Sequence, residues 1–422
     1  MSESIESEVN EPRDGYKQVQ LGPKEFSIPE EWRVRTVAEV TENLDRQREP
    51  IKSSNRENGD VPYYGATGQI DSVSGHIFDE KLVLIGEDGA DWSPFGGTAY
   101  IIEGKSWVNN HVHVLRATDV VEEYLAYFFE YVDMRHVISG TNRGKLNQGE
   151  LNSFPVLTPP IPEQQRIAAV LSILTEEIDQ TERLIETAEE LKQGFFQDIY
   201  LSPEHGATTT KKPKNVPDNW DVKKLDELCE IGGGSTPKRS NPEYWNGDTP
   251  WCSPKEFDKR GIIEETEDQV TQEGINEAPL TIYPANSTLV PVRSNVIKRR
   301  LPIGKITIPS TINQDLKALV PDEEQIDPEY LFQVLHYNSE RIRLTCRKSG
   351  TTIDSIDTTA LSKYEIMVPE LQKQRYFSQI LSTIDKKIKL EEHHKQKLEE
   401  LRRGLMQDLL TGAVRTPTGL LD

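Results

Sequence analysis

The chain has 422 residues, of which 35% are hydrophobic, and a formal net charge of −21 at pH 7. A chain of this length has room for about two or three domains with separate cores. It has no apolar run of the ~20 residues needed to span a bilayer, and its acidic start does not match a secretory signal, so we expect a cytoplasmic protein. Cys229, Cys252 and Cys346 have no CxxC or HxxxH spacing, which excludes a disulfide framework and a zinc site of the usual kind.

The first half of the chain changes character twice. Residues 1–28 are polar and acidic and predict a flexible lead-in. Residues 29–160 contain short apolar runs broken by glycine, which predict a β-rich domain with one helix at 122–138. Over 161–202 apolar residues recur at steps of three and four, so a long helix is expected there. About 39 residues at 1.5 Å each give roughly 58 Å, more than one globular domain requires.

The second half follows the same order. A linker is predicted at 203–216, a second β-rich domain at 217–368, a second long helix at 369–412 and a short tail at 413–422. The first helix is acidic and the second is basic, which favours their packing. We therefore expect an α+β fold with two β-rich domains separated by two long antiparallel helices that form a coiled coil. The alternative, in which each helix only closes its own domain, is disfavoured by helix length.

The similarity between the halves extends to short motifs. EELKQGFFQDIYL at 189–201 returns as EELRRGLMQDLLT at 399–411, and SGT at 139–141 returns at 349–351. A period near 200 residues is too long for a solenoid, whose units reach about 50 residues, and indicates a duplicated domain with a pseudo-two-fold axis. Similar partners should therefore contact both halves. The residues expected to pack the helices or dock a partner are Leu171, Leu174, Ile178, Leu191, Leu381, Ile384, Ile388, Leu401 and Leu405.

Motifs for catalysis are weak in this sequence. Asp91, Glu103 and Lys105 have the D…ExK order of many metal-dependent nucleases, but this spacing is common by chance and has no counterpart in the second half. His111 and His113 share one face of a predicted strand, yet no third metal ligand is evident. No G-x-S-x-G or HExxH motif is present. We predict a binding protein without catalytic or metal-ligating residues.

Basic clusters recur in both β-rich domains despite the acidic total. Loop lysines and arginines supply phosphate contacts and guanine readout, although any single cluster is more often a solvated surface. Beyond these clusters the domains diverge, and GGGSTPKRSNPEYWNGDTPWCSP has no close partner in the first copy. The candidate DNA-binding residues are Arg46, Arg48, Lys52, Arg56, Arg143, Lys145, Lys238, Arg239, Lys298, Arg299, Arg300, Lys305, Arg347 and Lys348.

Several motifs together resemble one known family. PEEWRVRTVAEV and PDNWDVKKLDEL open the two halves, and PYYGATGQI and GGGSTPKRSNPEYWNGDTPW follow within them. LNSFPVLTPPIPEQQRIAAVLSILTEEID and LSKYEIMVPELQKQRYFSQILSTIDKKI lead into the two helices, and KQRYFSQIL carries one residue more than QQRIAAVL. Over about residues 29–412 the chain resembles the DNA-specificity subunit of type I restriction–modification systems.

The resemblance implies a division of labour between subunits. Each β-rich domain would be a target-recognition domain for one half of a split DNA sequence, and the helices would set the spacing and dock two methyltransferase subunits. The chain would have no enzymatic activity of its own and bind no cofactor. S-adenosylmethionine, ATP and Mg would belong to partner subunits, including a restriction and translocase subunit. Two alternatives stay open, namely a specificity subunit of another phage-defence methyltransferase complex and a coiled-coil scaffold that binds no DNA.

Overall fold

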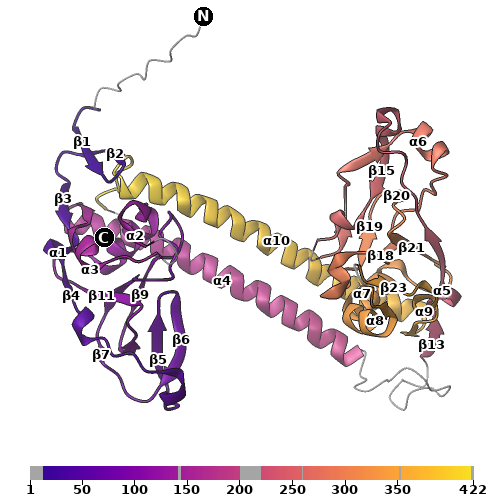
Figure 1. Ribbon diagram of the computed structural model, residues 1–422, viewed down its shortest axis with the longest axis horizontal. Coiled ribbons are helices and arrows are strands. Elements are labelled where there is room, and N and C mark those ends of the chain that lie inside the picture. Colours follow the sequence, from indigo (N-terminus) through magenta and orange to yellow (C-terminus); the bar gives the residue numbers. More distant parts are fainter. Residues whose placement is uncertain (1–12, 141–143, 200–219, 259, 351–352, 420–422) are drawn as a thin grey trace, which may run out of the picture. The chain divides into compact units, whose positions relative to one another are not determined.

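A computed structural model describes residues 13–140, 144–199, 220–258, 260–350 and 353–419. The chain divides into two compact units, the first within residues 1–183 and 392–422 and the second within residues 184–391. Two long helices, α4 (Ile161–Ile199) and α10 (Leu371–Leu410), each contribute one part to either unit (Figure 1). The predicted linker at 203–216 lies outside the described residues.

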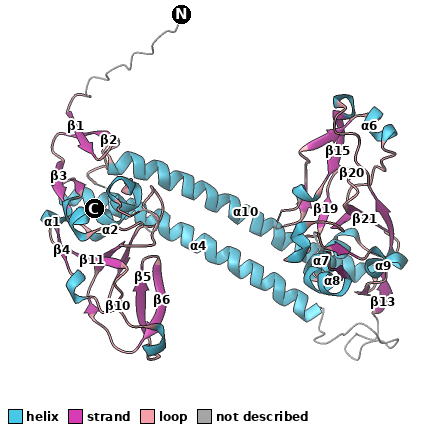
Figure 2. Ribbon diagram, viewed as in Figure 1, coloured by secondary structure: helices cyan, strands magenta, loops and turns pink. Residues whose placement is uncertain are grey.

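The first unit combines two sheets with short helices (Figure 2). One sheet has the strand order β4-β11-β8-β9 and the other β6-β5-β10-β7, while β1 pairs with β2 and β3 pairs with β12. The elements are β1 (Tyr16–Leu21), β2 (Lys24–Pro29), β3 (Arg33–Thr36), α1 (Val37–Val40), β4 (Thr41–Asn43), β5 (Val61–Gly65), β6 (Gly68–Val73), β7 (Phe78–Asp79), β8 (Leu82–Gly86), β9 (Ala99–Ile102), β10 (Lys105–Val108), β11 (Val112–Ala117), α2 (Glu122–Tyr131), α3 (Gln148–Ser153) and β12 (Pro155–Thr158), with 3-10 turns η1 (Asp45–Gln47), η2 (Ser53–Asn55) and η3 (Arg135–Val137).

The second unit repeats this topology. Its sheets run β14-β21-β18-β19-β16 and β17-β15-β20, so the first has one added strand and the second lacks the counterpart of β7. The elements are β13 (Asp221–Lys224), α5 (Leu225–Leu228), β14 (Cys229–Gly233), β15 (Trp245–Cys252), β16 (Ile262–Ile263), β17 (Asp268–Val270), α6 (Gln272–Glu277), β18 (Thr288–Pro291), β19 (Gly304–Ile306), β20 (Thr311–Ile312), β21 (Leu316–Pro321), α7 (Pro328–Tyr337), α8 (Ser339–Cys346), β22 (Arg347–Lys348), β23 (Ser355–Ile356), α9 (Thr358–Ser362) and β24 (Glu365–Val368), with 3-10 turns η4 (Pro242–Tyr244), η5 (Pro254–Glu256) and η6 (Asn295–Lys298). The α+β fold with an internal repeat is confirmed.

Each unit buries the ends of both long helices in its own core. In the first unit Leu171 of α4 and Leu410 of α10 lie in one cluster with Trp32 and Phe128, and all four are at most 1% exposed. In the second unit Phe377 of α10 packs with the core of α7. Burial of one large apolar side chain contributes about 1.5–3 kcal/mol, so each helix end is held by its domain.

The helices run antiparallel within each unit. In the first unit Thr175 of α4 accepts a hydrogen bond from Arg402 of α10 at 3.1 Å, while Glu182, further along α4, pairs with Lys395 at 2.8 Å. Arg402 also pairs with Glu130 of α2 at 2.5 Å, which ties the domain to the helices. The pairs show that residue numbers rise along α4 as they fall along α10.

The predicted helix-packing residues divide into two groups. Leu171, Leu381 and Ile388 are buried, and Leu174, Ile178, Ile384 and Leu405 are partly buried. Leu191 and Leu401 are 62% and 51% exposed, so of the two predicted roles only partner docking stays open for them, as a prediction.

Buried glutamines show the register of the repeat at the helix entry. Gln164 accepts a hydrogen bond from the amide of Val121 at 2.9 Å and donates to the carbonyl of Pro159 at 2.8 Å. Gln374 bonds Asp327 and Pro369 in the same way, at 2.8 Å each. Gln164 therefore corresponds to Gln374, 210 positions later, which removes the extra residue inferred from the KQR and QQR motifs.

The N-terminal segment is more ordered than its sequence predicts. Within the stretch 1–28, predicted to be flexible, β1 and β2 form an antiparallel hairpin, while residues 1–12 lie outside the described part. Leu21 and Ile28 are buried, and Tyr16 Oη donates to the carbonyl of Gly412 at 2.8 Å. The hairpin was missed because its alternation covers few residues and its partner is the distant C-terminal tail. No helix of the described residues is long and apolar enough to cross a membrane.

Candidate nucleic-acid interface

Described residues in and beside the two SGT motifs form strand pairings at matching places in the two domains. In the first domain Ser139 and Asp88 both bridge to Lys145, next to the end of β8. In the second domain β22 pairs with β23, and Arg293 bridges to Ser355 next to the end of β18. The repeat is therefore present in the structure as well as in the sequence, and it carries basic side chains in both domains.

In the first domain the hairpin lysine joins a buried ionic network. Lys145 pairs with Glu87 at 2.8 Å, and Glu87 also pairs with Arg48 at 2.5 Å. Arg48 is only 13% exposed and donates to the carbonyl of Val112 at 2.6 Å. Arg48 thus acts inside the domain, whereas Lys145 is 49% exposed at its edge. Arg143 lies outside the described residues.

The same network contains a buried histidine. His113 Nε2 donates to the carbonyl of Leu146 at 2.8 Å, and its Nδ1 lies 2.6 Å from a carboxylate oxygen of Asp45. Burial raises the pKa of Asp45, but hydrogen bonds from His113 and Val114 and the charge of Arg48 bring it below its ordinary value. Both ring nitrogens of His113 thus face oxygen acceptors, which fixes the orientation of the ring.

Asp45, Glu87 and His113 also have the composition of a metal site. Their ligand atoms lie within 4.8 Å of one another. However, Arg48 and Lys145 already provide the positive charge that a cation would supply, and the pKa of Glu87 stays low through these two partners despite burial. We interpret the cluster as a network of ion pairs that connects Lys145 to the β4-β11-β8-β9 sheet.

In the second domain the hairpin cations pair with nearby carboxylates. Arg347 lies 2.7 Å from Asp354, which is 3% exposed, and Lys348 lies 2.7 Å from Asp357. The hydrogen bond from the amide of Gly350, together with the charges of Arg347 and Lys298, lowers the pKa of Asp354. The structure therefore brings Arg347 and Lys298 to one carboxylate, although they are about 50 residues apart in sequence.

The Lys298–Arg300 cluster forms a rigid turn. Arg343, which the sequence reasoning did not single out, is 8% exposed and donates to the carbonyls of Ile297 and Lys298 at 3.3 Å each. Arg299 and Arg300 are exposed at this turn. Arg343 also pairs with Glu340, three residues earlier, at 2.5 Å. Its contact with the turn leaves no local sequence signal, because the two carbonyls lie over 40 residues away.

The other candidates differ in exposure. Lys305 is 11% exposed, pairs with Glu329 and lies 5.4 Å from the ring of Phe332, so its charge is used inside the domain. Arg56 and Arg239 lie over aromatic rings in the loops that precede β5 and β15. Exposed candidates without an ion-pair partner among the described residues are Arg46, Lys52, Lys238, Arg299 and Arg300.

Comparisons with known proteins agree with this arrangement. The type I restriction modification DNA specificity domain matches residues 29–190 and 217–400. The EcoR124I/EcoR124II specificity subunit of Escherichia coli is 28% identical over 62% of this chain and 63% of its own length. The MjaVIII specificity subunit of Methanocaldococcus jannaschii is 21% identical over 92% of this chain and 94% of its own length. The chain spans 44% of the MjaIX specificity subunit from the same archaeon.

A solved structure shares the fold. The type I restriction–modification S subunit from M. genitalium aligns with a TM-score of 0.62 at 15% identity, covering 90% of this chain and 96% of that one. The family model covers both halves, and each match contains one of the two repeated domains described above. The chain therefore belongs to the type I restriction–modification DNA specificity family and contains its domain twice.

Proposed function

We propose that this chain is the specificity subunit of a type I restriction–modification complex, with one recognition domain for each half of a bipartite DNA target. The observation that carries the proposal is the matching strand order of the two units, each with a basic hairpin at the same place. Two copies of one framework with different loops suit two different half-sites. The chain itself would supply no catalysis, and it would act in the cytoplasm.

The charges suggest how an acidic protein binds DNA. The exposed candidates without ion-pair partners in the described chain, such as Lys52 and Arg299, would neutralise phosphates at little cost. Lys145, Arg347 and Lys348 must first leave carboxylates, and their ion pairs hold them in place until a phosphate competes. This competition would weaken binding to arbitrary sequences, because only a matched target adds base contacts.

The repeated EEL-x-x-G motif supports docking of two identical partners. Leu191 and Leu401 are exposed at equivalent positions of α4 and α10. Gly194 and Gly404 follow three residues later inside helices, and a Cβ at either would meet no atom within 4 Å among the described residues. A glycine inside a helix costs about 0.5–1 kcal/mol relative to alanine. Close approach of a partner backbone at both sites would account for these glycines.

These partners would be two methyltransferase subunits, and a restriction and translocase subunit would join them. S-adenosylmethionine would bind to the methyltransferase subunits, while ATP and Mg would serve the translocase. A complex without a nuclease remains the second form that this architecture could serve in phage defence.

Methylation mapping tests the proposal. The chain is co-expressed with the methyltransferase encoded beside it, and modified adenines are mapped across the host genome by long-read sequencing. We expect one split motif with two short defined halves and a fixed gap. A stable complex that methylates nothing would contradict DNA specificity and favour a scaffold, whereas the absence of a complex would contradict docking on the helices.

A further inference from the structure

One arginine in the first domain joins a loop to strands β5 and β6. The loop between β4 and β5 carries Arg56, whose guanidinium lies 4.4 Å from the ring centre of Tyr63 on β5. Arg56 Nη1 also lies 2.8 Å from a carboxylate oxygen of Asp71 on β6, and its Nε donates to the carbonyl of Ile51 at 3.2 Å. The arginine therefore connects the loop to two neighbouring strands of the β6-β5-β10-β7 sheet.

The second domain contains the same arrangement. The loop between β14 and β15 carries Arg239, whose guanidinium lies 3.8 Å and 4.8 Å from the ring centres of Trp245 and Trp251 on β15. Two hydrogen bonds of 3.1 Å and 2.8 Å join it to Asp268 on β17. A planar guanidinium can stack and bind a carboxylate at once, which an ammonium group cannot do.

Strand register shows that the two clusters are equivalent. Tyr63 lies opposite Asp71 in the antiparallel β5–β6 pair, as Trp251 lies opposite Asp268 in the β15–β17 pair. On the other side, β5 and β15 each have a parallel neighbour, β10 and β20. The motif GGGSTPKRSNPEYWNGDTPWCSP thus has a structural partner in the first copy, although the sequence shows none.

The aromatic side chains also hold the loop backbones. In the first domain Trp107 Nε1 donates to the carbonyl of Glu49 at 2.6 Å, and Tyr63 Oη accepts from the amide of Ile51 at 3.0 Å. In the second domain Trp251 Nε1 donates to the carbonyl of Ser235 at 3.0 Å, and Trp245 Nε1 donates to that of Lys238 at 3.4 Å.

These bonds fix the loops from which basic side chains project. Lys52 and Lys238 are exposed, and neither has an ion-pair partner within the part of the chain that the structure describes. The pKa values of Asp71 and Asp268 are lowered by hydrogen bonds from Arg56 and Arg239, so both pairs stay ionised at neutral pH. Each loop is thus tied to its sheet by an ion pair, a stacked ring and backbone hydrogen bonds.

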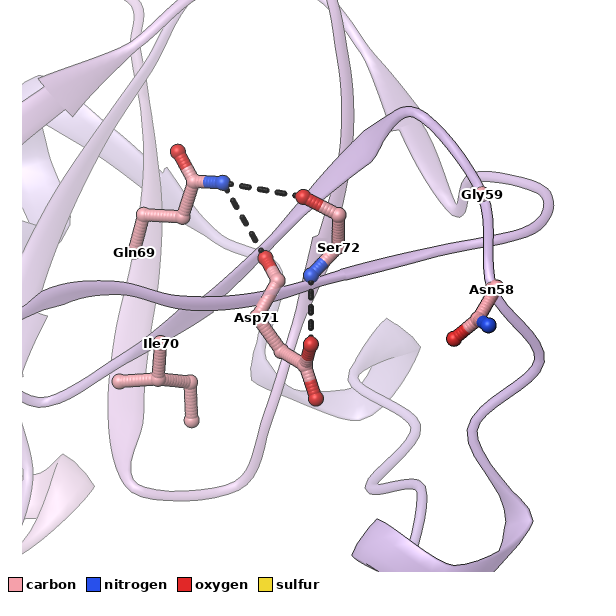
Figure 3. A pocket seen from close by; sticks show the side chains of 6 residues that line it. All are labelled: Asn58, Gly59, Gln69, Ile70, Asp71 and Ser72. Carbon is pink, nitrogen blue, oxygen red and sulfur yellow. Dashed lines mark hydrogen bonds between the residues drawn. The ribbon is translucent and has the colours of Figure 1, made fainter. Parts of the chain in front are cut away.

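A polar hollow adjoins the first cluster. Asn58 and Gly59 from the loop and Gln69, Ile70, Asp71 and Ser72 from β6 line a shallow, open hollow of about 560 Å³ (Figure 3). Gln69 Nε2 donates to the carbonyl of Asp71 and to Ser72 Oγ at 3.2 Å each, which leaves its carbonyl oxygen as an acceptor. Amide and hydroxyl groups along the edge strand β6 suit contact with base edges in a major groove.

We propose that the Arg56–Tyr63–Asp71 and Arg239–Trp251–Asp268 clusters are matched clamps, each of which positions the DNA-reading loop of its own domain. The clamp residues are positioning residues, while Lys52 and Lys238 grip phosphates. This inference rests on the proposed DNA specificity. It identifies the β4–β5 and β14–β15 loops as the ones that read the duplex. Each clamp controls reading of one half-site only, because its bonds stay within one domain.

Lysine substitutions test the clamps because they keep the charge and lose the planar group. R56K and R239K chains, assembled with the methyltransferase subunits, select from a duplex library with randomised base pairs. We expect R239K to lose about tenfold in discrimination per base pair, a factor that corresponds to ~1.4 kcal/mol, in one half-site and R56K to lose it in the other. K52A and K238A should instead weaken binding to all sequences and reduce the salt slope by about one.

A matched control separates positioning from folding. Arg135 pairs with Asp133 through its guanidinium at 2.6 Å but lies on an exposed turn away from the clamp loop, so R135K should leave both half-sites unchanged. D268N removes the carboxylate charge while keeping its shape and should affect the same half as R239K. If R56K and R239K keep wild-type discrimination in both halves, or if each alters both halves, the clamp proposal is overturned. If the wild-type complex selects no motif, the proposed function itself fails.

Discussion

The C-terminal tail offers a direct test of how the first unit closes. Arg415 donates to the two carboxylate oxygens of Glu163 at 2.6 Å and 2.7 Å, and Trp32 Nε1 donates to the same group at 3.1 Å. The Glu163 side chain is 3% exposed, whereas Arg415 is 40% exposed and also pairs with Glu31 at 2.6 Å. At the equivalent position of the second unit the chain has Lys373, so this latch belongs to the first unit alone.

Replacing Arg415 with methionine should leave a buried carboxylate with one neutral donor. Hydrogen bonds to charged groups contribute about 1.5–3 kcal/mol each, and breaking a buried ion pair costs roughly 3–5 kcal/mol. Because Arg415 is partly exposed, water can reach the site after the substitution, and we expect the lower range of about 2–3 kcal/mol. Glu163→Gln in addition should recover about 1 kcal/mol, since the orphaned charge is then absent.

Hydrogen exchange measures this loss locally. Amides of residues 404–419 should exchange faster in R415M by the factor that corresponds to about 2–3 kcal/mol, roughly 30- to 150-fold if exchange is at equilibrium. Lys397→Met on the exposed surface of α10 is the control and should leave these rates unchanged. If the tail amides of R415M exchange at the wild-type rate, the Arg415–Glu163 contact does not hold the tail.

Three further outcomes follow from the contacts above. The pKa of Asp45 is lowered in the folded protein, so its carboxylate stabilises the first unit above pH ~3.8. This stabilisation is lost as the pH falls through the lower pKa of the folded state. Asp45→Asn should therefore make the stability of the first unit less dependent on pH in this acidic range, as measured by acid unfolding followed by circular dichroism. Leu191→Ser with Leu401→Ser should leave melting unchanged and weaken methyltransferase binding in calorimetry at least tenfold, about 1.4 kcal/mol. Lys305→Met should destabilise the second unit by about 2–3 kcal/mol in denaturant titration and leave DNA affinity unchanged, because its charge is paired with Glu329 inside the domain.

The sequence predicts the helices and the repeat better than it predicts the site. The periodicity of α4 continues over 39 residues, which no strand pattern imitates. The β1–β2 hairpin was missed, and the sequence left open whether Leu191 and Leu401 face the other helix or a partner, because both depend on which distant surface covers each side chain. The local sequence pattern indicates whether a segment is a helix or a strand. Which face of that segment is buried depends on tertiary contacts.

Basic residues were found by type, but their partners were not. Glu87 and Asp354 determine whether Lys145 and Arg347 are available to a ligand, and no spacing in the sequence connects these pairs. The matched clamps were hidden for a related reason. The loops between the first strands differ in length between the domains, so their residues do not align, while the strand register that unites them appears only in three dimensions.

In the proposed function, each recognition domain reads one half of the DNA target, and α4 and α10 set the gap between the halves. The most direct test replaces the second recognition domain, residues 217–368, with that of another family member and maps methylated adenines after co-expression with the methyltransferase. We expect a motif in which one half changes while the other half and the gap length remain. A motif changed in both halves, or one changed in neither, would contradict this expectation.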